Sequence, residues 1–270
     1  MARPNGVREL WAAGKPVINS WLCIPSSFSA EVMAHAGWDS LVVDMQHGMI
    51  DYQMMVTMLQ GISTTNTTPL VRVPWNDPAH IQKALDAGAY GIICPMINNR
   101  AEAEKFASSM RYAPVGSRSS GPIRASLYGG PDYHAKANDI VVALGMIETV
   151  EAMSNLDDIL STPGLDAAYV GPSDLSISHG YPPGGDKSDE WMFAAMKKVI
   201  DTCKRHGKQP GMHCASPAYA LKALEMGFTF VTVGGDTRFV TIGAAAAVKE
   251  MRDGLGGAAP KPAGGSSSPY

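Results

Sequence analysis

Strand-like and helix-like segments alternate along almost the whole chain, and this alternation restricts the fold more than any other feature. Short apolar runs predict buried strands, and a longer segment with helical spacing follows each one. The predicted strands are Val17–Leu22, Ser40–Asp44, Pro69–Val73, Gly91–Pro95, Val141–Ile147, Ala167–Gly171, Pro210–Cys214 and Phe228–Val233. The predicted helices are Ser29–Ala36, Asp51–Ile62, Asp77–Ala87, Arg100–Met110, Glu151–Leu160, Glu190–His206, Pro217–Met226 and Phe239–Arg252.

Eight strand–helix units in about 250 residues indicate an α/β protein with a (β/α)8 TIM barrel. A doubly wound open sheet shows the same alternation, but it usually has fewer strands. No G-x-G-x-x-G motif follows the first strand, which argues against a nucleotide cofactor. We predict a single barrel domain over residues 1–253. Residues 254–270, rich in Gly and Ser, predict a disordered low-complexity tail.

The charge pattern excludes several classes of partner. The formal net charge is -3 over 270 residues, and Lys and Arg form no basic stripe, so we predict no binding to nucleic acid or membrane. No apolar run reaches the roughly 18 residues of a membrane span, and the N-terminus has no signal-peptide pattern, which predicts a cytoplasmic protein. The four cysteines contain no C-x-x-C pair, which favours buried reduced thiols over a zinc site.

Two acidic residues stand just past the ends of consecutive predicted strands. Glu148 follows the run Ala143–Ile147, and Asp174 comes soon after Ala167–Gly171. In an α/β barrel such positions lie in the loops that carry the chemistry. Two carboxylates completed by water and substrate oxygens suit Mg²⁺ or Mn²⁺ better than zinc. The sequence thus predicts a divalent-metal site at this pair, with Asp44 as the nearest competing ligand. The alternative is that either carboxylate caps a following helix, although no clear helix follows Asp174 at once.

Three more polar residues come from strand ends and would share the same mouth. His47 follows the second strand, and in this company we interpret it as a general base, since imidazole titrates near working pH. Arg72 lies inside an apolar strand and therefore needs a partner or a ligand. It either forms a salt bridge to a barrel carboxylate or binds a substrate carboxylate or a developing oxyanion. For His213 only its position at a strand end suggests a functional role, and we interpret it as a satisfied core histidine.

A long insertion, residues 111–140, separates the fourth helix from the fifth strand. It is rich in Gly, Ser, Pro and Arg, and it contains Arg118 and Arg124. A connection of this length is often functional. It could close over a polar substrate, lie on the surface or contact another subunit. Trp21, near the end of the first strand, is interpreted as a core residue, with substrate contact as the alternative.

Four motifs in a fixed order carry a resemblance to a known family. They are Asp44-Met45-Gln46-His47-Gly48, Val71-Arg72-Val73-Pro74-Trp75-Asn76-Asp77-Pro78, Met146-Ile147-Glu148-Thr149 and Val170-Gly171-Pro172-Ser173-Asp174-Leu175. With them the chain resembles the HpcH/HpaI aldolase family, the class II pyruvate aldolases. The resemblance extends from about Trp21 to the last helix. It implies reversible cleavage of a 4-hydroxy-2-oxoacid to pyruvate, or a relative such as hydroxypyruvate, and an aldehyde.

The resemblance also implies roles for individual residues. Glu148 and Asp174 fall on the family's metal ligands, which would hold Mg²⁺, Mn²⁺ or Co²⁺. His47 falls on its catalytic histidine, and Arg72 on the arginine that holds the pyruvyl oxygens. Asp86 resembles the aspartate that partners this histidine, although pattern alone would make it a solvated helix residue. No Schiff-base lysine is implied.

Further expectations concern the substrate and the assembly. Backbone N–H groups of Ser173 and Asp174 would help to seat the substrate carboxylate. Some members carry Gln where this chain has Met146, so one hydrogen bond to the substrate would be absent. Arg124 is expected to bind the substrate, and it belongs to the loop Arg118–Arg124 that differs among members, which leaves the identity of the aldehyde open. The family usually forms hexamers in which the last helix packs on a neighbour.

Two other functions remain open from the sequence. A related barrel lyase acting on a CoA thioester, of the citrate- or malyl-CoA-lyase kind, would use the same carboxylates and need an extra surface for CoA. A non-catalytic 2-oxoacid sensor would bind metal and pyruvate without turnover.

Overall fold

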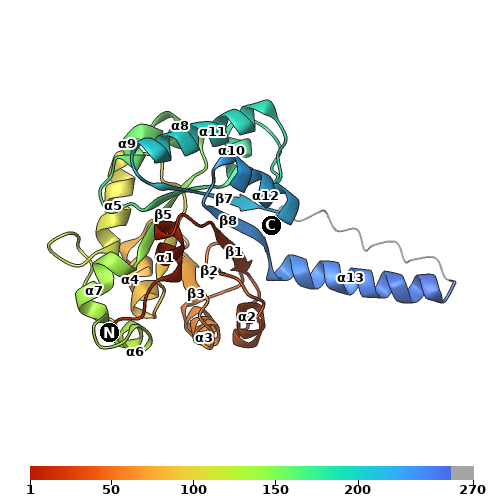
Figure 1. Ribbon diagram of the computed structural model, residues 1–270, viewed down its shortest axis with the longest axis horizontal. Coiled ribbons are helices and arrows are strands. Elements are labelled where there is room, and N and C mark those ends of the chain that lie inside the picture. Colours follow the sequence, from red (N-terminus) through yellow and green to blue (C-terminus); the bar gives the residue numbers. More distant parts are fainter. Residues whose placement is uncertain (257–270) are drawn as a thin grey trace.

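The computed structural model describes residues 1–256, and within them parallel strands form a closed barrel surrounded by helices (Figure 1). The eight strands pair in chain order, and β8 closes the barrel by pairing with β1. The predicted (β/α)8 TIM barrel is therefore confirmed. Because all strands are parallel, their carboxyl ends gather at one end of the barrel and their amino ends at the other.

The strands are short and lie close to the predicted positions. They are β1 (Val17–Leu22), β2 (Ser40–Asp44), β3 (Thr68–Arg72), β4 (Gly91–Cys94), β5 (Val142–Ile147), β6 (Ala167–Val170), β7 (Gln209–Cys214) and β8 (Phe230–Gly235). The helices are α1 (Gly6–Ala12), α2 (Ser27–Ala34), α3 (Tyr52–Ile62), α4 (Pro78–Asp86), α5 (Arg100–Met110), α6 (Ile123–Gly129), α7 (Tyr133–Ile140), α8 (Val150–Ser154), α9 (Leu156–Leu160), α10 (Pro172–Ser178), α11 (Glu190–Arg205), α12 (Pro217–Met226) and α13 (Asp236–Gly254).

Side chains alternate along each strand between the inside of the barrel and the surrounding helices, which produces two separate cores. Val42, Leu70, Ile93 and Tyr169 belong to the inner core. The outer core lies between sheet and helices and contains residues at the alternate positions, among them Val43. This alternation decides which strand residues reach the mouth of the barrel.

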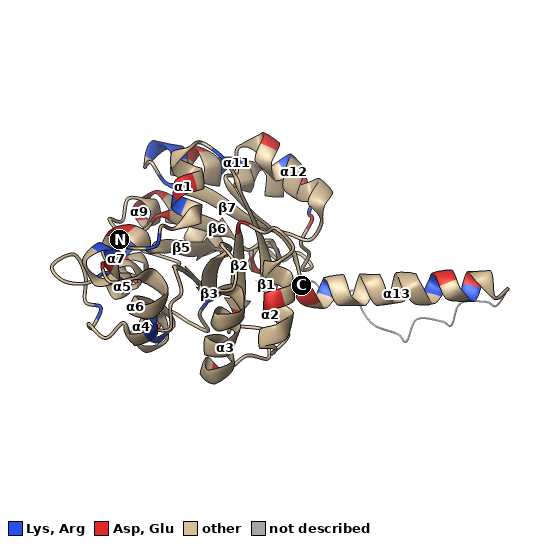
Figure 2. Cartoon of the chain, turned by 60° about the horizontal axis from the view of Figure 1, so that its bottom comes forward, with Lys and Arg blue, Asp and Glu red and all other residues tan. Residues whose placement is uncertain are grey.

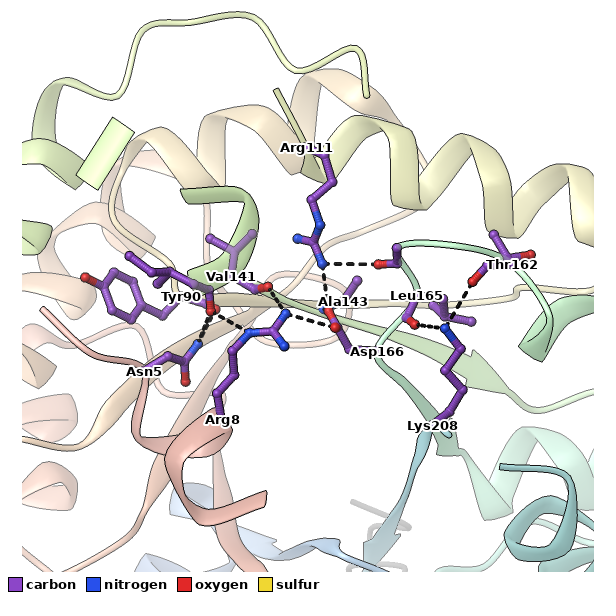
Figure 3. A network of polar contacts seen from close by, with 12 residues as sticks. Asn5, Arg8, Tyr90, Arg111, Val141, Ala143, Thr162, Leu165, Asp166 and Lys208 are labelled. Atoms are coloured by element: carbon purple, nitrogen blue, oxygen red, sulfur yellow. Dashed lines mark hydrogen bonds and ion pairs between the residues drawn. The ribbon is translucent and has the colours of Figure 1, made fainter. Parts of the chain in front are cut away.

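The amino end of the barrel is closed by α1, which the sequence analysis did not predict. Val7 of α1 is fully buried in the inner core. Asp166, just before β6, accepts hydrogen bonds from Arg8 of α1 (2.8 Å) and from Arg111 (2.7 Å) (Figure 3). It also accepts one from the Ala143 backbone N–H (2.8 Å). These contacts fix α1 beneath the strands and leave the carboxyl end as the mouth.

The insertion at residues 111–140 is more ordered than its composition suggested, since it contains α6 and α7. It connects the end of α5 to the start of β5, so it lies at the amino end of the barrel. Helices α6 and α7 pack on Tyr90, which precedes β4, through a small aromatic cluster that includes Tyr112 and Tyr133. The insertion therefore cannot close over the mouth of its own barrel.

The last helix, α13, extends away from the barrel (Figure 1). Figure 2 shows that its middle carries no charged side chain, and the uncharged stretch separates Arg238 from Lys249. Val240, Ile242 and Met251 are exposed on it. The tail was predicted for residues 254–270. Helix α13 includes Gly254, and residues 257–270 lie outside the described part. No helix in residues 1–256 is long and apolar enough to cross a membrane.

Candidate active site

The polar side chains at the carboxyl end of the barrel come from the last inward-facing positions of several strands. Trp21 lies on β1, Asp44 on β2, Arg72 on β3 and His213 on β7, whereas Glu148 follows β5 directly. All of these side chains are buried or nearly so. Apolar side chains below them fill the barrel, so these residues form the floor of the mouth.

Arg72 is held by an ion pair and by an aromatic ring. Asp44 and Arg72 are direct partners in the register of β2 and β3. Arg72 donates from Nε to Asp44 Oδ1 (2.7 Å) and from Nη2 to Asp44 Oδ2 (2.6 Å). Its guanidinium lies 3.9 Å from the centre of the Trp21 ring, in a cation–π contact. Arg72 thus does form the predicted salt bridge to a barrel carboxylate, and Nη1 is the nitrogen that Asp44 does not engage.

Asp44 also shapes the loop that carries His47. Its Oδ1 accepts the backbone N–H groups of Gln46 (3.1 Å) and His47 (3.3 Å). Burial opposes the charged form of Asp44, but Arg72 and these hydrogen bonds prevail and lower its pKa. Because both oxygens of the carboxylate are engaged by the protein, Asp44 is a poor competitor for the metal.

His47 is exposed, and the charges of Arg72, Asp44 and Asp174 act on it. Partial desolvation lowers its pKa, and so does the charge of Arg72, while Asp44 and Asp174 act in the opposite direction. The net result favours the neutral imidazole at neutral pH, which is the form that a general base needs. The structure thus brings His47 together with Arg72 and Asp174.

Glu148 and Asp174 occupy neighbouring strand ends, and neither caps a helix. Thr149 is the N-cap of α8, and its side chain accepts the backbone N–H of Ala152 (3.0 Å). Asp174 lies in the first turn of α10, whose N-cap is Gly171. The expectation that no helix follows Asp174 at once is wrong, because Asp174 is inside one. Pro172 at the first position of α10 favours that start.

The environment of Glu148 destabilises the charged form of its carboxyl group. Its side chain is 2% exposed, and Oε1 accepts one hydrogen bond, from the backbone N–H of Met96 (2.8 Å). Burial raises the pKa of Glu148 to about 7, and the nearby charge of Asp174 adds to this, against the hydrogen bond from Met96. Met96 holds a φ of 55°, a left-handed conformation that is uncommon away from glycine. The backbone is therefore strained where it contacts this carboxylate.

A divalent cation fits this pair of carboxylates. Glu148 is buried and the like charge of Asp174 acts on it, so a cation held by these two hard oxygen donors would relieve both the repulsion and the burial of Glu148. Within residues 1–256, no group of three or more His, Cys, Asp or Glu side chains is arranged to hold a metal ion. The remaining ligand positions would therefore fall to water and substrate oxygens, which suits Mg²⁺ or Mn²⁺.

The residues predicted to contact the substrate beside this site are also placed near it. Ser173 is buried in the first turn of α10, where backbone N–H groups have no partner within the helix. Met146 is 3% exposed in the inner core, and its methyl group lies close to Gly171. A thioether is only a weak acceptor and donates no hydrogen bond, in contrast to the Gln of some family members.

Asp86 is not brought to His47 within this chain. It is the last residue of α4, so it lies at the amino end of the barrel, whereas His47 lies at the carboxyl end. Its Oδ1 accepts a hydrogen bond from Arg118 (2.8 Å), whose side chain is fully buried. Burial raises the pKa of Asp86, and Arg118 opposes that shift. Any contact between Asp86 and a His47 requires a second copy of the chain.

Arg124 is at the same end as Asp86. It donates from Nη1 to the backbone oxygen of Ala87 (2.6 Å) and from Nη2 to Ser63 Oγ (2.9 Å). These residues are the C-caps of α4 and α3, so Arg124 neutralises two helix ends. The predicted substrate contact of Arg124 is likewise absent within one chain and would need a neighbouring copy.

Two functional features escaped the sequence analysis. Gly171 provides the space that Glu148 occupies, since a Cβ there would overlap Glu148 Oε2. Asp44 organises both Arg72 and the His47 loop. The signal for Asp44 was present, because aligning the ends of the second and third strands places a carboxylate opposite the buried arginine.

Several known proteins are similar to this chain over most of its length. The model of the HpcH/HpaI aldolase/citrate lyase family matches residues 19–241. A hydroxypyruvate/pyruvate aldolase from Rhizorhabdus wittichii is 42% identical over 248 residues, covering 92% of this chain and 99% of that protein. A 4-hydroxy-2-oxo-heptane-1,7-dioate aldolase from Salmonella dublin is 40% identical over 245 residues, covering 90% and 92%. The crystal structure of a family protein from Burkholderia cenocepacia superimposes with a TM-score of 0.85 at 30% identity, covering 92% of this chain and 99% of that one.

Proposed function

The chain belongs to the HpcH/HpaI aldolase/citrate lyase family, and from that premise we propose a divalent-metal-dependent class II aldolase of 2-oxoacids. Aldolase activity itself, a carbon–carbon lyase reaction, follows from relatives at 40 to 42% identity. The single observation that carries the metal-dependent mechanism is the pair of Glu148 and Asp174 next to His47 and Arg72. The CoA-thioester lyase and the non-catalytic sensor are not favoured, because these relatives are named aldolases.

Each side chain in the mouth has a distinct part in the cleavage of a 4-hydroxy-2-oxoacid. His47, in its neutral form, accepts the proton of the substrate's 4-hydroxyl group as the bond between C3 and C4 breaks. The electron pair of that bond moves into the 2-oxoacid fragment, and Arg72 stabilises the negative charge on its keto oxygen. The released aldehyde leaves, and the proton that His47 took up is returned to C3, which gives pyruvate or its hydroxy analogue and restores the neutral imidazole.

A Mg²⁺, Mn²⁺ or Co²⁺ ion held by Glu148 and Asp174 would supply Lewis acidity at the carboxylate and keto oxygens. The backbone N–H groups of Ser173 and Asp174 would bind the substrate carboxylate beside it. Met146 and Trp21 would line the floor of the same space. Because the ion pair with Asp44 fixes the plane of the guanidinium, Arg72 can direct Nη1 at the substrate without reorganisation.

The assembly is part of the proposal. The apolar, exposed middle of α13 supports an exchange of this helix with a neighbouring subunit in a hexamer. We further propose that Asp86 and Arg124 act on the active site of a neighbouring copy, because their own barrel places them at the wrong end. A cytoplasmic location remains the prediction from the sequence.

A retro-aldol screen tests the function. Purified protein would be incubated with a panel of 4-hydroxy-2-oxoacids, and pyruvate release would be followed by a coupled assay. We expect turnover that EDTA abolishes and that Mg²⁺, Mn²⁺ or Co²⁺ restores. His47→Ala should lose about 100-fold or more in kcat and still bind Mn²⁺. A lysine adduct trapped by borohydride in the presence of pyruvate would contradict the metal-dependent mechanism.

A further inference from the structure

His213 is the last inward-facing residue of β7, at the level of the mouth. Its neighbours Met212 and Cys214 point outward and belong to the outer core. In the sheet register His213 pairs with Thr232 of β8. The centres of its ring and of the Trp21 ring lie 5.0 Å apart, and the two ring planes are 77° from parallel. His213 therefore borders the same floor as Arg72, whose guanidinium lies over the same indole.

A chain of buried polar groups beneath His213 fixes where each proton lies, and it begins at Asn19. The amide of Asn19 satisfies both of its ends when the nitrogen faces Ser40. The nitrogen then donates to the backbone oxygen (3.0 Å) and to Oγ (2.8 Å) of Ser40, and the oxygen accepts from the backbone N–H of Ser20 (3.3 Å) and from Thr232 Oγ1 (2.9 Å). The two backbone groups decide this orientation, because a backbone oxygen can only accept and a backbone N–H can only donate. The single hydroxyl proton of Thr232 is thereby assigned to Asn19. Thr232 Oγ1 has two remaining lone pairs, and each of them can only accept a hydrogen bond.

Trp21 Nε1 donates a hydrogen bond to Thr232 Oγ1 (3.1 Å) and occupies the first lone pair. Tyr169 Oη lies 2.7 Å from Thr232 Oγ1 and fills the second. Since Thr232 has no proton left, the proton between them belongs to Tyr169. Tyr169 Oη also lies 3.4 Å from His213 Nδ1. Tyr169 has already given its proton, so this contact needs a proton on His213 Nδ1.

The imidazole of His213 is therefore the Nδ1–H tautomer, and its Nε2 carries a lone pair. Nδ1 faces Tyr169, which is fully buried, whereas the His213 residue as a whole keeps 9% of its surface exposed. No described residue is hydrogen-bonded to Nε2. Burial and the charge of Arg72 lower the pKa of His213 to about 4, which keeps the ring neutral at working pH.

Resting on the proposed aldolase function, we propose that His213 is a specificity-determining residue whose Nε2 accepts a hydrogen bond from a hydroxyl group of the substrate. The hydroxyl could belong to the 2-oxoacid, as in hydroxypyruvate, or to the aldehyde, as in glycolaldehyde. Either way, the site would favour hydroxylated substrates over analogues that lack the hydroxyl. Discrimination of this kind is strong when a buried acceptor would otherwise stay unpaired.

Paired substrates test the proposal in the synthesis direction. One arm compares hydroxypyruvate with pyruvate at a fixed aldehyde, and the other compares glycolaldehyde with acetaldehyde at fixed pyruvate. His213→Phe keeps a ring and removes the acceptor, whereas His213→Gln restores an acceptor near the position of Nε2. We expect His213→Phe to lower the ratio of kcat/KM for one hydroxylated substrate to its analogue by about tenfold. His213→Gln should recover most of that ratio, and thermal melts would confirm that both variants fold.

If His213→Phe lowered kcat/KM equally for the hydroxylated substrates and their analogues, or did not lower it at all, the proposal would be overturned. The tautomer gives a check that needs no turnover. NMR of isotope-labelled histidine rings, with the His213 signals assigned from their absence in His213→Phe, should show a protonated Nδ1 and a bare Nε2. The opposite tautomer would also overturn the proposal. A wild-type protein that cleaves no 2-oxoacid substrate would instead contradict the proposed function, whatever the tautomer.

Discussion

Asp44 and Arg72 face each other across β2 and β3 and are joined by hydrogen bonds of 2.6 and 2.7 Å inside the barrel. The same carboxylate binds the backbone of the loop that carries His47. One buried ion pair thus fixes both the group that would stabilise the enolate and the group that would move the proton. Removal of either partner should therefore affect folding and catalysis together.

Asp44→Asn should cost about 3 kcal/mol of unfolding free energy, because it leaves the buried guanidinium of Arg72 without its counter-charge. Urea unfolding would measure this loss. Glu104→Gln is a matched control, since Glu104 forms a half-exposed ion pair with Arg100 at 2.7 Å. That variant should cost at most about 0.5 kcal/mol. Similar losses of unfolding free energy in both variants would show that the buried pair of Asp44 and Arg72 stabilises the protein no more than the surface pair does.

The stability of the metal-free protein should depend on the protonation of Glu148. Its pKa is about 7 in the folded protein against an ordinary value of 4.5. Between these values the folded state holds a proton that the unfolded chain has released. Stability therefore falls as the pH rises through this window, by up to about 3 kcal/mol from this one group. In Glu148→Gln this part of the pH dependence should vanish, which urea unfolding in EDTA at several pH values would show.

Metal binding should release the proton that Glu148 holds below its folded pKa. Calorimetric titration with Mn²⁺ at about pH 6, in two buffers of different ionisation enthalpy, measures the protons released. We expect close to one proton for the wild type. Glu148→Gln should bind Mn²⁺ far more weakly. Tight binding by this variant, or no proton release by the wild type, would show that Glu148 is not a ligand.

Gly171→Ala should disrupt the metal site although Gly171 holds an ordinary negative φ. The added methyl group would overlap Glu148 Oε2 and would come within 3.1 Å of the Met146 methyl group. Glu148 would have to move, so Mn²⁺ affinity should fall about tenfold or more, as for other disturbances of a metal ligand's setting. Gly254→Ala serves as the control, because a Cβ there meets no atom within 4 Å and Gly254 lies at the end of α13, outside its apolar middle. It should leave the Mn²⁺ affinity unchanged.

The exposed face of α13 should hold subunits together. Ile242→Asp and Met251→Asp place charges on side chains that are 53% and 66% exposed in the single chain. If α13 packs on a neighbour, these charges would be buried, and the assembly should dissociate. Light scattering after size exclusion would measure the mass. Leu221→Asp, on a residue of α12 that is 62% exposed, is the control and should leave the mass unchanged. An unaltered mass in all three variants would contradict the exchanged helix.

The barrel could be predicted from the sequence because the evidence for it lies in short stretches of the chain. Runs such as Leu41–Val43 and Ile92–Cys94 have the apolar character of strands buried on both faces, and their rhythm with the helices leaves few topologies. The strand-end residues His47, Arg72, Glu148 and Asp174 followed from the same argument. Position relative to a strand end is a property of the chain, and the barrel then carries all such positions to one mouth.

The sequence by itself determined the fold class and the chemical character of the mouth, since both depend on residue type and spacing along the chain. The tertiary structure decided which side chains meet. It joined Arg72 to Asp44, separated Asp86 and Arg124 from the mouth, and gave His213 a hydrogen-bonded neighbour, Tyr169, whose proton is already assigned to Thr232. These outcomes depend on strand register and on the end of the barrel that each loop reaches, and neither is set by any short stretch of sequence.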